Sequence, residues 1–103
     1  MTTVKVHLRA VAQQDIEKAV DFYVLEQAPQ SALDLIDEVE RAFTHLAQFP
    51  ATGSPRYAHE LGLPGLRSWI LGRFPYTLFY MEQNGEVDVW RVLHQRTDIP
   101  QWL

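Results

Sequence analysis

The side chains best suited to chemistry lie in the last third of the chain. They are Arg67, Arg73, Arg91, His94 and Arg96. Cleavage of RNA without a metal needs groups that deprotonate a 2′-hydroxyl, protonate the leaving oxygen and stabilise a charged phosphorane. Arginine and histidine can do this work if they converge on one phosphate, so RNA cleavage is the first chemistry to weigh.

Strand geometry argues against such convergence. Residues 87–94 have the pattern of a strand, in which neighbouring side chains point to opposite faces. Arg91 would then lie on one face and His94 on the other, unless a bulge intervenes. Both lysines, Lys5 and Lys18, are remote from this region in the sequence. The residue types therefore indicate binding through arginines rather than catalysis, and we predict no catalytic residue.

The same side chains also have purely structural interpretations. His94 could be a neutral histidine at a strand end that donates to a backbone carbonyl. Arg67 and Arg91 could form salt bridges with acids on neighbouring strands, such as Glu82 or Asp88. The sequence leaves these alternatives open.

The chain has no residue pattern that suggests metal or thiol chemistry. The sequence contains no cysteine, which excludes disulfides, thiolate zinc sites and cysteine nucleophiles. His7, His45 and His59 show no metal-ligand spacing with His94. We therefore expect no metal and no cofactor, and the lack of cysteine fits a cytoplasmic protein.

Hydrophobic periodicity predicts the elements of the first half. Alternating apolar and polar residues predict a strand over 3–10. Helical spacing then predicts a helix from about residue 13 to 27, with acidic residues near its start. A second helix is expected from Ser31 to Phe49, because Ser31 and Asp34 resemble a capping box.

The second half reads as a loop followed by three strands. Breaker residues end the helical half after Phe49, and a loop continues to Gly65. Strands are predicted over 66–71, 76–82 and 87–94, with an Asn-Gly pair between the last two that favours a tight hairpin. The order β-α-α-β-β-β predicts one α+β domain over the whole chain, with a helical hairpin packed on a mainly antiparallel sheet.

The distribution of charge narrows the classes of partner. The net charge is −4, and residues 11–50 carry eight acids against Lys18 and Arg41, which gives −6 there. A general phosphate-binding surface is therefore not expected, because nonspecific nucleic-acid affinity comes from neutralising many phosphates. No stretch has the roughly 18 apolar residues that a bilayer span needs, so we expect no membrane partner.

The predicted strands carry apolar residues on both faces. The even-numbered Leu78 and Tyr80 would point to one face of the sheet, whereas the odd-numbered Phe79 and Met81 would point to the other. One face is needed for the helices, so the other is expected to be covered by a protein partner.

The order and spacing of these pieces resemble the ParE/RelE toxin superfamily of bacteria. The resemblance covers nearly the whole chain, although no single piece is specific. The pieces are Ala12…Asp15-Ile16…Phe22-Tyr23, Ala32…Phe43…Leu46…Phe49-Pro50, Gly53, Pro64-Gly65-Leu66-Arg67, Pro75-Tyr76…Phe79-Tyr80 and Arg91-Val92-Leu93-His94-Gln95-Arg96-Thr97-Asp98.

The resemblance implies a small toxin whose surface is wrapped by a cognate antitoxin protein, with which it forms a hetero-oligomer. ParE-like members poison DNA gyrase, whereas RelE-like members cut messenger RNA in the ribosomal A site. The RelE-like pattern places a lysine-rich segment before the last strand and often a tyrosine near the end. Here no tyrosine follows Tyr80, and the ending is similar to ParE-like members.

We therefore predict a ParE-like toxin that binds DNA gyrase through Arg67, Arg91, His94 and Arg96, without direct sequence-specific contact to nucleic acid. The alternatives are a RelE-like ribosome-dependent mRNA endonuclease and a non-toxic interaction module with the same fold. The tail with Trp102 could be a mobile end or could pack back on the domain.

Overall fold

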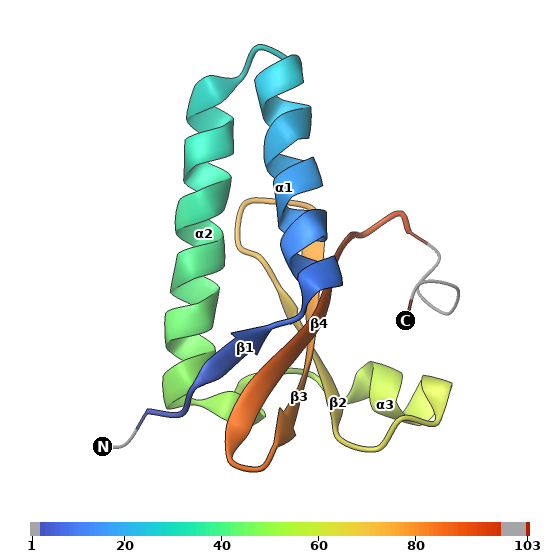
Figure 1. The fold of residues 1–103 in the computed structure, drawn as a ribbon. Coiled ribbons are helices and arrows are strands. Elements are labelled where there is room, and N and C mark those ends of the chain that lie inside the picture. The colour runs from blue at the N-terminus through green and yellow to red at the C-terminus, as the bar shows by residue number, and fades with distance from the viewer. Residues whose placement is uncertain (1–2, 98–102) are drawn as a thin grey trace.

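The computed structural model describes residues 3–97 and residue 103. In this part of the chain, three α-helices and a short 3-10 turn surround a four-stranded sheet (Figure 1). The elements are β1 (Val6–Leu8), α1 (Ala10–Leu25), α2 (Pro29–Gln48), the 3-10 turn η1 (Pro50–Thr52), α3 (Arg56–Leu61), β2 (Leu66–Ile70), β3 (Tyr76–Gln83) and β4 (Glu86–His94). Trp102 lies outside the described residues.

The sheet has the strand order β1-β4-β3-β2. Both pairings in the second half are antiparallel, whereas β1 pairs with β4 in parallel. The predicted α+β fold with a mainly antiparallel sheet is therefore confirmed. The first strand is shorter than the predicted 3–10, because the chain before it follows α2 instead, with the Val4 N–H donating to the Ala47 carbonyl at 2.8 Å.

Both long helices begin earlier than the sequence suggested. Asp15, which was expected near the start of α1, lies in its second turn and is buried. Pro29 occupies the first turn of α2, where its fixed φ suits a helix and its missing N–H costs nothing. The predicted capping box is therefore wrong, and Asp34 instead accepts a hydrogen bond from the Gln30 side chain at 2.9 Å.

The predicted loop before β2 contains α3, which the sequence reading missed. Its start is marked by Ser54, whose hydroxyl accepts the Arg56 N–H at 3.2 Å. Its end is marked by Gly62, which has a left-handed φ of 64° that glycine adopts readily. A short helix with these flanking residues was readable as a start and stop signal.

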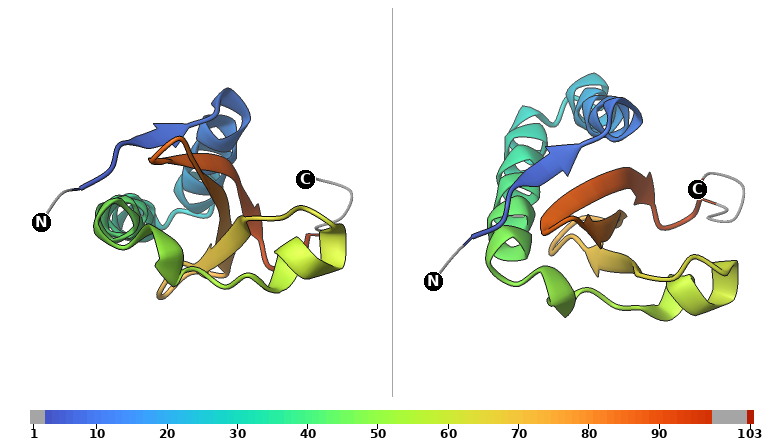
Figure 2. Two further views of the ribbon diagram at one scale, coloured as in Figure 1. Left: turned by 90° about the horizontal axis from the view of Figure 1, so that it is seen from below. Right: turned by 60° about the horizontal axis from the view of Figure 1, so that its bottom comes forward.

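The sheet is packed on both faces by the chain itself. One core cluster joins α1 and α2 to one side of the sheet, with Leu35, Leu46 and Tyr80 fully or almost fully buried. On the other side, Leu66 and Phe79 pack under α3. Figure 2 shows the long helices and α3 on opposite sides of the sheet. The apolar residues of both parities therefore have intramolecular partners, and the expectation that a partner protein must cover a whole sheet face is wrong.

A bulge in β4 changes which residues share a face. Phe79 pairs with Arg91 and Tyr80 with Val89, so Trp90 is the extra residue. Val89 and Val92, three positions apart, consequently enter the same core cluster. The predicted hairpin after β3 is confirmed, since Asn84 and Gly85 have φ values of 54° and 73°.

A buried tyrosine ties the turn after α2 to the sheet. The Tyr80 hydroxyl donates to the Pro50 carbonyl at 2.7 Å and accepts the Gly53 N–H at 2.9 Å. Gly53 is required by this close approach, because a Cβ there would lie 2.4 Å from the phenolic oxygen. The turn that leads to α3 is thus held by one side chain from the centre of the sheet.

This tyrosine predicts a loss of stability at alkaline pH. The pKa of Tyr80 is raised above its ordinary value, chiefly because burial disfavours the phenolate, while the Gly53 N–H and the charge of Arg67 act in the opposite direction. The folded protein therefore keeps the phenol proton to higher pH than the unfolded chain. Its contribution to stability is complete below about pH 10 and is lost as the pH rises further.

Urea unfolding between about pH 8 and pH 11 checks this expectation. The free energy of unfolding should be level up to about pH 10 and then fall, and it should fall less steeply in Tyr80→Phe. Burial also raises the pKa of Tyr76, so some alkaline decline remains in that variant. Identical slopes in the two proteins would contradict the role assigned to Tyr80.

Candidate functional site

Arg91, the central residue of the predicted site, is held in a buried ion pair. Its guanidinium donates to both carboxylate oxygens of Asp15 at 2.7 and 2.8 Å, and the side chains are only 15% and 7% exposed. Asp15 also accepts the Val92 N–H at 3.0 Å. The hydrogen bonds that Arg91 donates to Asp15 raise the pKa of Arg91, against the lowering effect of burial. The pair therefore joins α1 to the bulged part of β4.

Arg67 also has a contact within the domain. It lies on β2 and is half-buried, and its guanidinium donates to the Gly53 carbonyl at 2.8 Å. With Tyr80, it fixes the turn before α3 from the side of the sheet. Neither Arg67 nor Arg91 forms an ion pair with Glu82 or Asp88, so the structural alternative that named those two acids does not hold.

His94 and Arg96 lie at the open end of β4. The Nδ1 atom of His94 accepts the Arg96 N–H at 3.1 Å, and the ring packs edge-on against Tyr76 with centroids 5.2 Å apart. His94 thus accepts from a backbone N–H, whereas the structural alternative raised from the sequence had it donating to a carbonyl. The Arg96 side chain is exposed, so of the four predicted residues it is the most accessible.

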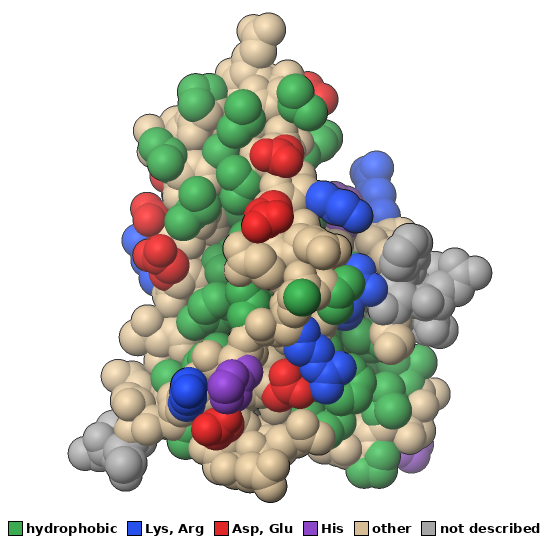
Figure 3. Space-filling model, viewed as in Figure 1, with side chains coloured by type: hydrophobic (Ala, Val, Ile, Leu, Met, Phe, Trp, Pro, Cys, Tyr) green, Lys and Arg blue, Asp and Glu red, His purple; other side chains and the backbone are tan. Residues whose placement is uncertain are grey.

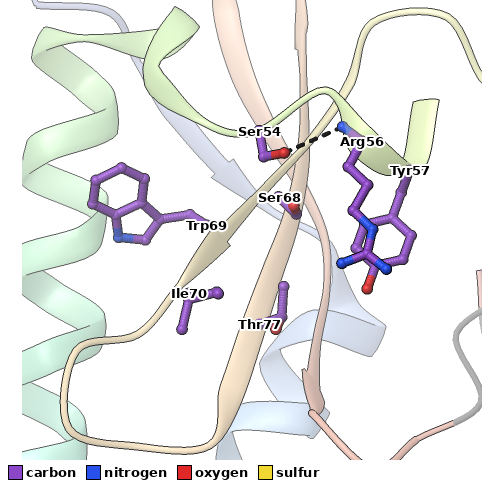
Figure 4. A pocket seen from close by; sticks show the side chains of 7 residues that line it. All are labelled: Ser54, Arg56, Tyr57, Ser68, Trp69, Ile70 and Thr77. Carbon is purple, nitrogen blue, oxygen red and sulfur yellow. Dashed lines mark hydrogen bonds between the residues drawn. The ribbon is translucent and has the colours of Figure 1, made fainter. Parts of the chain in front are cut away.

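A shallow groove runs beside the outer edge of β2, between α2 and the end of β4 that carries His94. It is called the β2 groove below. Three adjoining depressions of about 370, 360 and 280 Å³ share Ile70 in their walls. Figure 4 shows Arg56 and Tyr57 from α3 on one side of β2 and Trp69 directed toward α2 on the other. Gln95 closes the third depression, which brings the segment around Arg96 to the rim of the groove.

A second surface of note is the free end of the helical hairpin. Five of its large apolar side chains are more than a third exposed: Phe22, Val24, Leu25, Leu33 and Ile36. Hydrophobic side chains gather over this part of α1 and α2, with acidic groups beside them (Figure 3). In Figure 1 the strands of the sheet do not extend to this end of the hairpin. Hereafter the five residues are called the hairpin patch.

The sequence matches the family model described as the ParE toxin of the type II toxin-antitoxin system parDE, over residues 6–99. The chain belongs to the ParE toxin family. The fold is similar to a solved structure described as the chromosomal ParDE toxin-antitoxin system from P. aeruginosa, with a TM-score of 0.74 and 21% identity. That likeness covers 89% of this chain and 96% of the other. No curated protein sequence matches.

Two of the arginines considered for catalysis, Arg67 and Arg91, do not meet in this ParE toxin. Arg67 and Arg91 are bound to Gly53 and Asp15, and they hold different parts of the domain. No group of three or more acidic or histidine side chains in the described part could hold a metal ion. Likewise, none of the helices there has the length and apolarity needed to cross a bilayer.

Sequence reasoning missed the exposed arginines of this ParE toxin. Arg56 and Arg41 were given no role, and Arg73 was considered only for catalysis, yet their side chains are 68%, 71% and 65% exposed beside the β2 groove. Their separation in the sequence hides this grouping. Ser54 and Gly62, which flank α3, could have revealed this helix and so have placed Arg56.

Proposed function

We propose that this chain is the toxin of a type II toxin-antitoxin pair, that it inhibits DNA gyrase through protein contacts, and that a cognate antitoxin neutralises it. Membership of the ParE family carries the proposal, and the contacts of two arginines that were considered for catalysis support it. The guanidinium groups of Arg67 and Arg91 already hold the fold, so they cannot swing onto a phosphate without breaking it. A gyrase inhibitor needs no reacting group, only a complementary surface.

The four predicted contact residues divide into two kinds in this proposal. His94 and Arg96, at the open end of β4, contact the target directly. Arg67 and Arg91 are positioning residues, because their contacts shape the turn before α3 and the bulged strand. An exposed arginine suits protein recognition, since its planar five-donor fork pairs with carboxylates and backbone carbonyls.

The hairpin patch is the surface that we assign to the antitoxin. It is apolar, and it sits in the segment 11–50, whose net charge is −6. An amphipathic helix with basic residues along its flanks would satisfy both properties. Binding there would form the expected hetero-oligomer in the cytoplasm, and it would leave the part of the β2 groove beside α3 uncovered.

Purified toxin is expected to inhibit supercoiling by purified gyrase and to leave ribosome-bound mRNA intact. Its expression should arrest growth, and co-expression with the neighbouring open reading frame should restore growth. The test is a supercoiling assay run beside primer extension on translated mRNA. Codon-positioned cuts with unaffected supercoiling would favour the RelE-like nuclease, whereas harmless overproduction of folded protein would favour a non-toxic interaction module.

A further inference from the structure

The β2 groove has an unpaired strand edge along its floor. Ser68 exchanges backbone hydrogen bonds with Ser54 at 2.8 and 2.9 Å, so the N–H and C=O of Ser68 point away from β3. Ile70 lies two residues further along and has the same orientation, because the pattern repeats every second residue. No described residue bonds the Ile70 backbone on this side. The strand edge therefore has unpaired backbone groups at Ile70, just beyond the bridge between Ser54 and Ser68.

The side chains beside this edge are rigid and mostly apolar. Ile70 is 64% exposed, which is high for a large aliphatic residue on a strand. Tyr57 packs edge-on against Phe79 with ring centroids 5.3 Å apart, and Trp69 stacks on His45 at 4.6 Å. Both aromatic rings are thereby fixed by their own neighbours. They form walls for a ligand that lies along the strand.

Arginines flank the open edge at both ends. On the α2 side, Arg41 and Arg73 share the carboxylate of Glu38, at 3.1 and 3.7 Å. One acid against two guanidinium groups leaves a local charge of about +1. On the α3 side, Arg56 has a long contact of 3.4 Å to Glu60, and its side chain is 68% exposed. This local excess contrasts with the net charge of −4 for the chain.

We propose that the β2 groove binds an extended acidic segment of the toxin's target protein, which adds to the sheet as a strand beside Ile70. This inference rests on the proposed function, in that the target is a protein. The segment would exchange backbone hydrogen bonds with Ile70, place an apolar side chain against it, and set carboxylates near Arg56 and Arg73. Gln95 and Arg96 at the rim would extend the contact to the end of β4.

Charge and geometry favour this occupant over two others. A second copy of the toxin would bring Arg41, Arg56 and Arg73 against their own counterparts, and like charges that face each other oppose such pairing. A single-stranded nucleic acid would need free aromatic faces for base stacking. One face of Trp69 is already stacked on His45, and a phosphodiester backbone has no N–H to donate to the Ile70 carbonyl, whereas a peptide backbone does.

Charge reversal of the groove tests the proposal. The double variant Arg56→Glu/Arg73→Glu should raise the toxin concentration for half-inhibition of gyrase at least about tenfold, because two attractive contacts become repulsive. The matched control is Lys5→Glu/Lys18→Glu, which changes the net charge equally at exposed positions away from the groove. Antitoxin binding and thermal unfolding of each variant show that the fold is retained.

A second variant addresses the backbone. Ile70→Pro removes the outward N–H and leaves the pairing of β2 with β3 intact, since Pro is tolerated on strand edges. Inhibition should fall about tenfold or more, and Ile70→Val, which keeps the N–H, should lie between this variant and the wild type. Wild-type inhibition by both groove variants would overturn the proposal.

The outcomes separate the groove from the proposed function. Wild-type toxin that inhibits gyrase while the groove variants inhibit equally refutes the groove alone. If the wild type arrests growth without affecting gyrase, the gyrase assignment is wrong. Growth arrest by the groove variants then tests the groove: unchanged arrest refutes it, and lost arrest supports it. The groove can be probed with a labelled single-stranded RNA. If this RNA binds the wild type but not Arg56→Glu/Arg73→Glu, and that variant still inhibits gyrase, then the groove binds a nucleic acid and not a peptide.

Discussion

Asp15→Ala is expected to lower the free energy of unfolding by about 3–5 kcal/mol, the largest effect of any single change that we predict. The substitution removes the carboxylate to which the buried Arg91 guanidinium donates twice, and it also removes the acceptor of the Val92 N–H. Removal of one partner from a buried ion pair costs several kcal/mol, whereas an exposed pair contributes little. Chemical denaturation of the purified variant measures the loss.

The control removes both charges together. Asp15→Leu/Arg91→Met fills the same volume with apolar groups, and such replacements are often neutral or stabilising. Its unfolding free energy should therefore lie above that of Asp15→Ala. A double variant as unstable as Asp15→Ala would contradict the ion-pair explanation. If the double variant is stable but no longer inhibits gyrase, Arg91 contacts the target directly.

Gly53→Ala is expected to destabilise the protein by about 1–3 kcal/mol, as overpacking of a filled site does. The new methyl group would lie 2.4 Å from the Tyr80 oxygen and 2.7 Å from a ring carbon. The ring cannot retreat easily, because its hydroxyl is bonded to Pro50 and the residue is fully buried. The turn before α3 must move instead, so inhibition of gyrase should weaken with stability.

Gly72→Ala is the matched control for this change. A Cβ at Gly72 would meet a carboxylate oxygen of Glu38 at 3.1 Å, at the end of a flexible side chain that can shift. Its loss of stability should be below about 0.5 kcal/mol, in the range of ordinary surface substitutions. Equal losses for the two glycines, measured by thermal unfolding, would show that Tyr80 is not the obstacle.

The elements that could be predicted are those whose signals are local. The period of apolar residues gave both long helices, and the Asn-Gly pair gave the β3–β4 hairpin, because each depends on neighbours within a few residues. The bulge at Trp90 was not predictable, since it depends on pairing with β3. The parallel pairing of β1 with β4 joins residues such as Val6 and Val87, which no local pattern connects.

The site was harder to predict than the fold for the same reason. Arg91 was singled out by residue type, but its partner Asp15 is 76 positions away and was attributed to the helix start. Arg56, which was given no role, and Arg73, which was considered only for catalysis, are seen as a group only once β2 lies between them. Residue type indicates what a side chain can do, whereas tertiary contacts decide whether it is free to do it.

The pairing of the first strand with the last sets an order of events during synthesis. Residues 10–48 form a local helical hairpin, and contacts close in sequence form before distant ones. The sheet cannot close on β1 until β4 has left the ribosome, and the Asp15–Arg91 pair must wait for the same moment. A nascent toxin therefore presents its hairpin patch before its groove is complete. A chain truncated before β4 lacks the strand that completes the sheet, and we expect it not to be toxic.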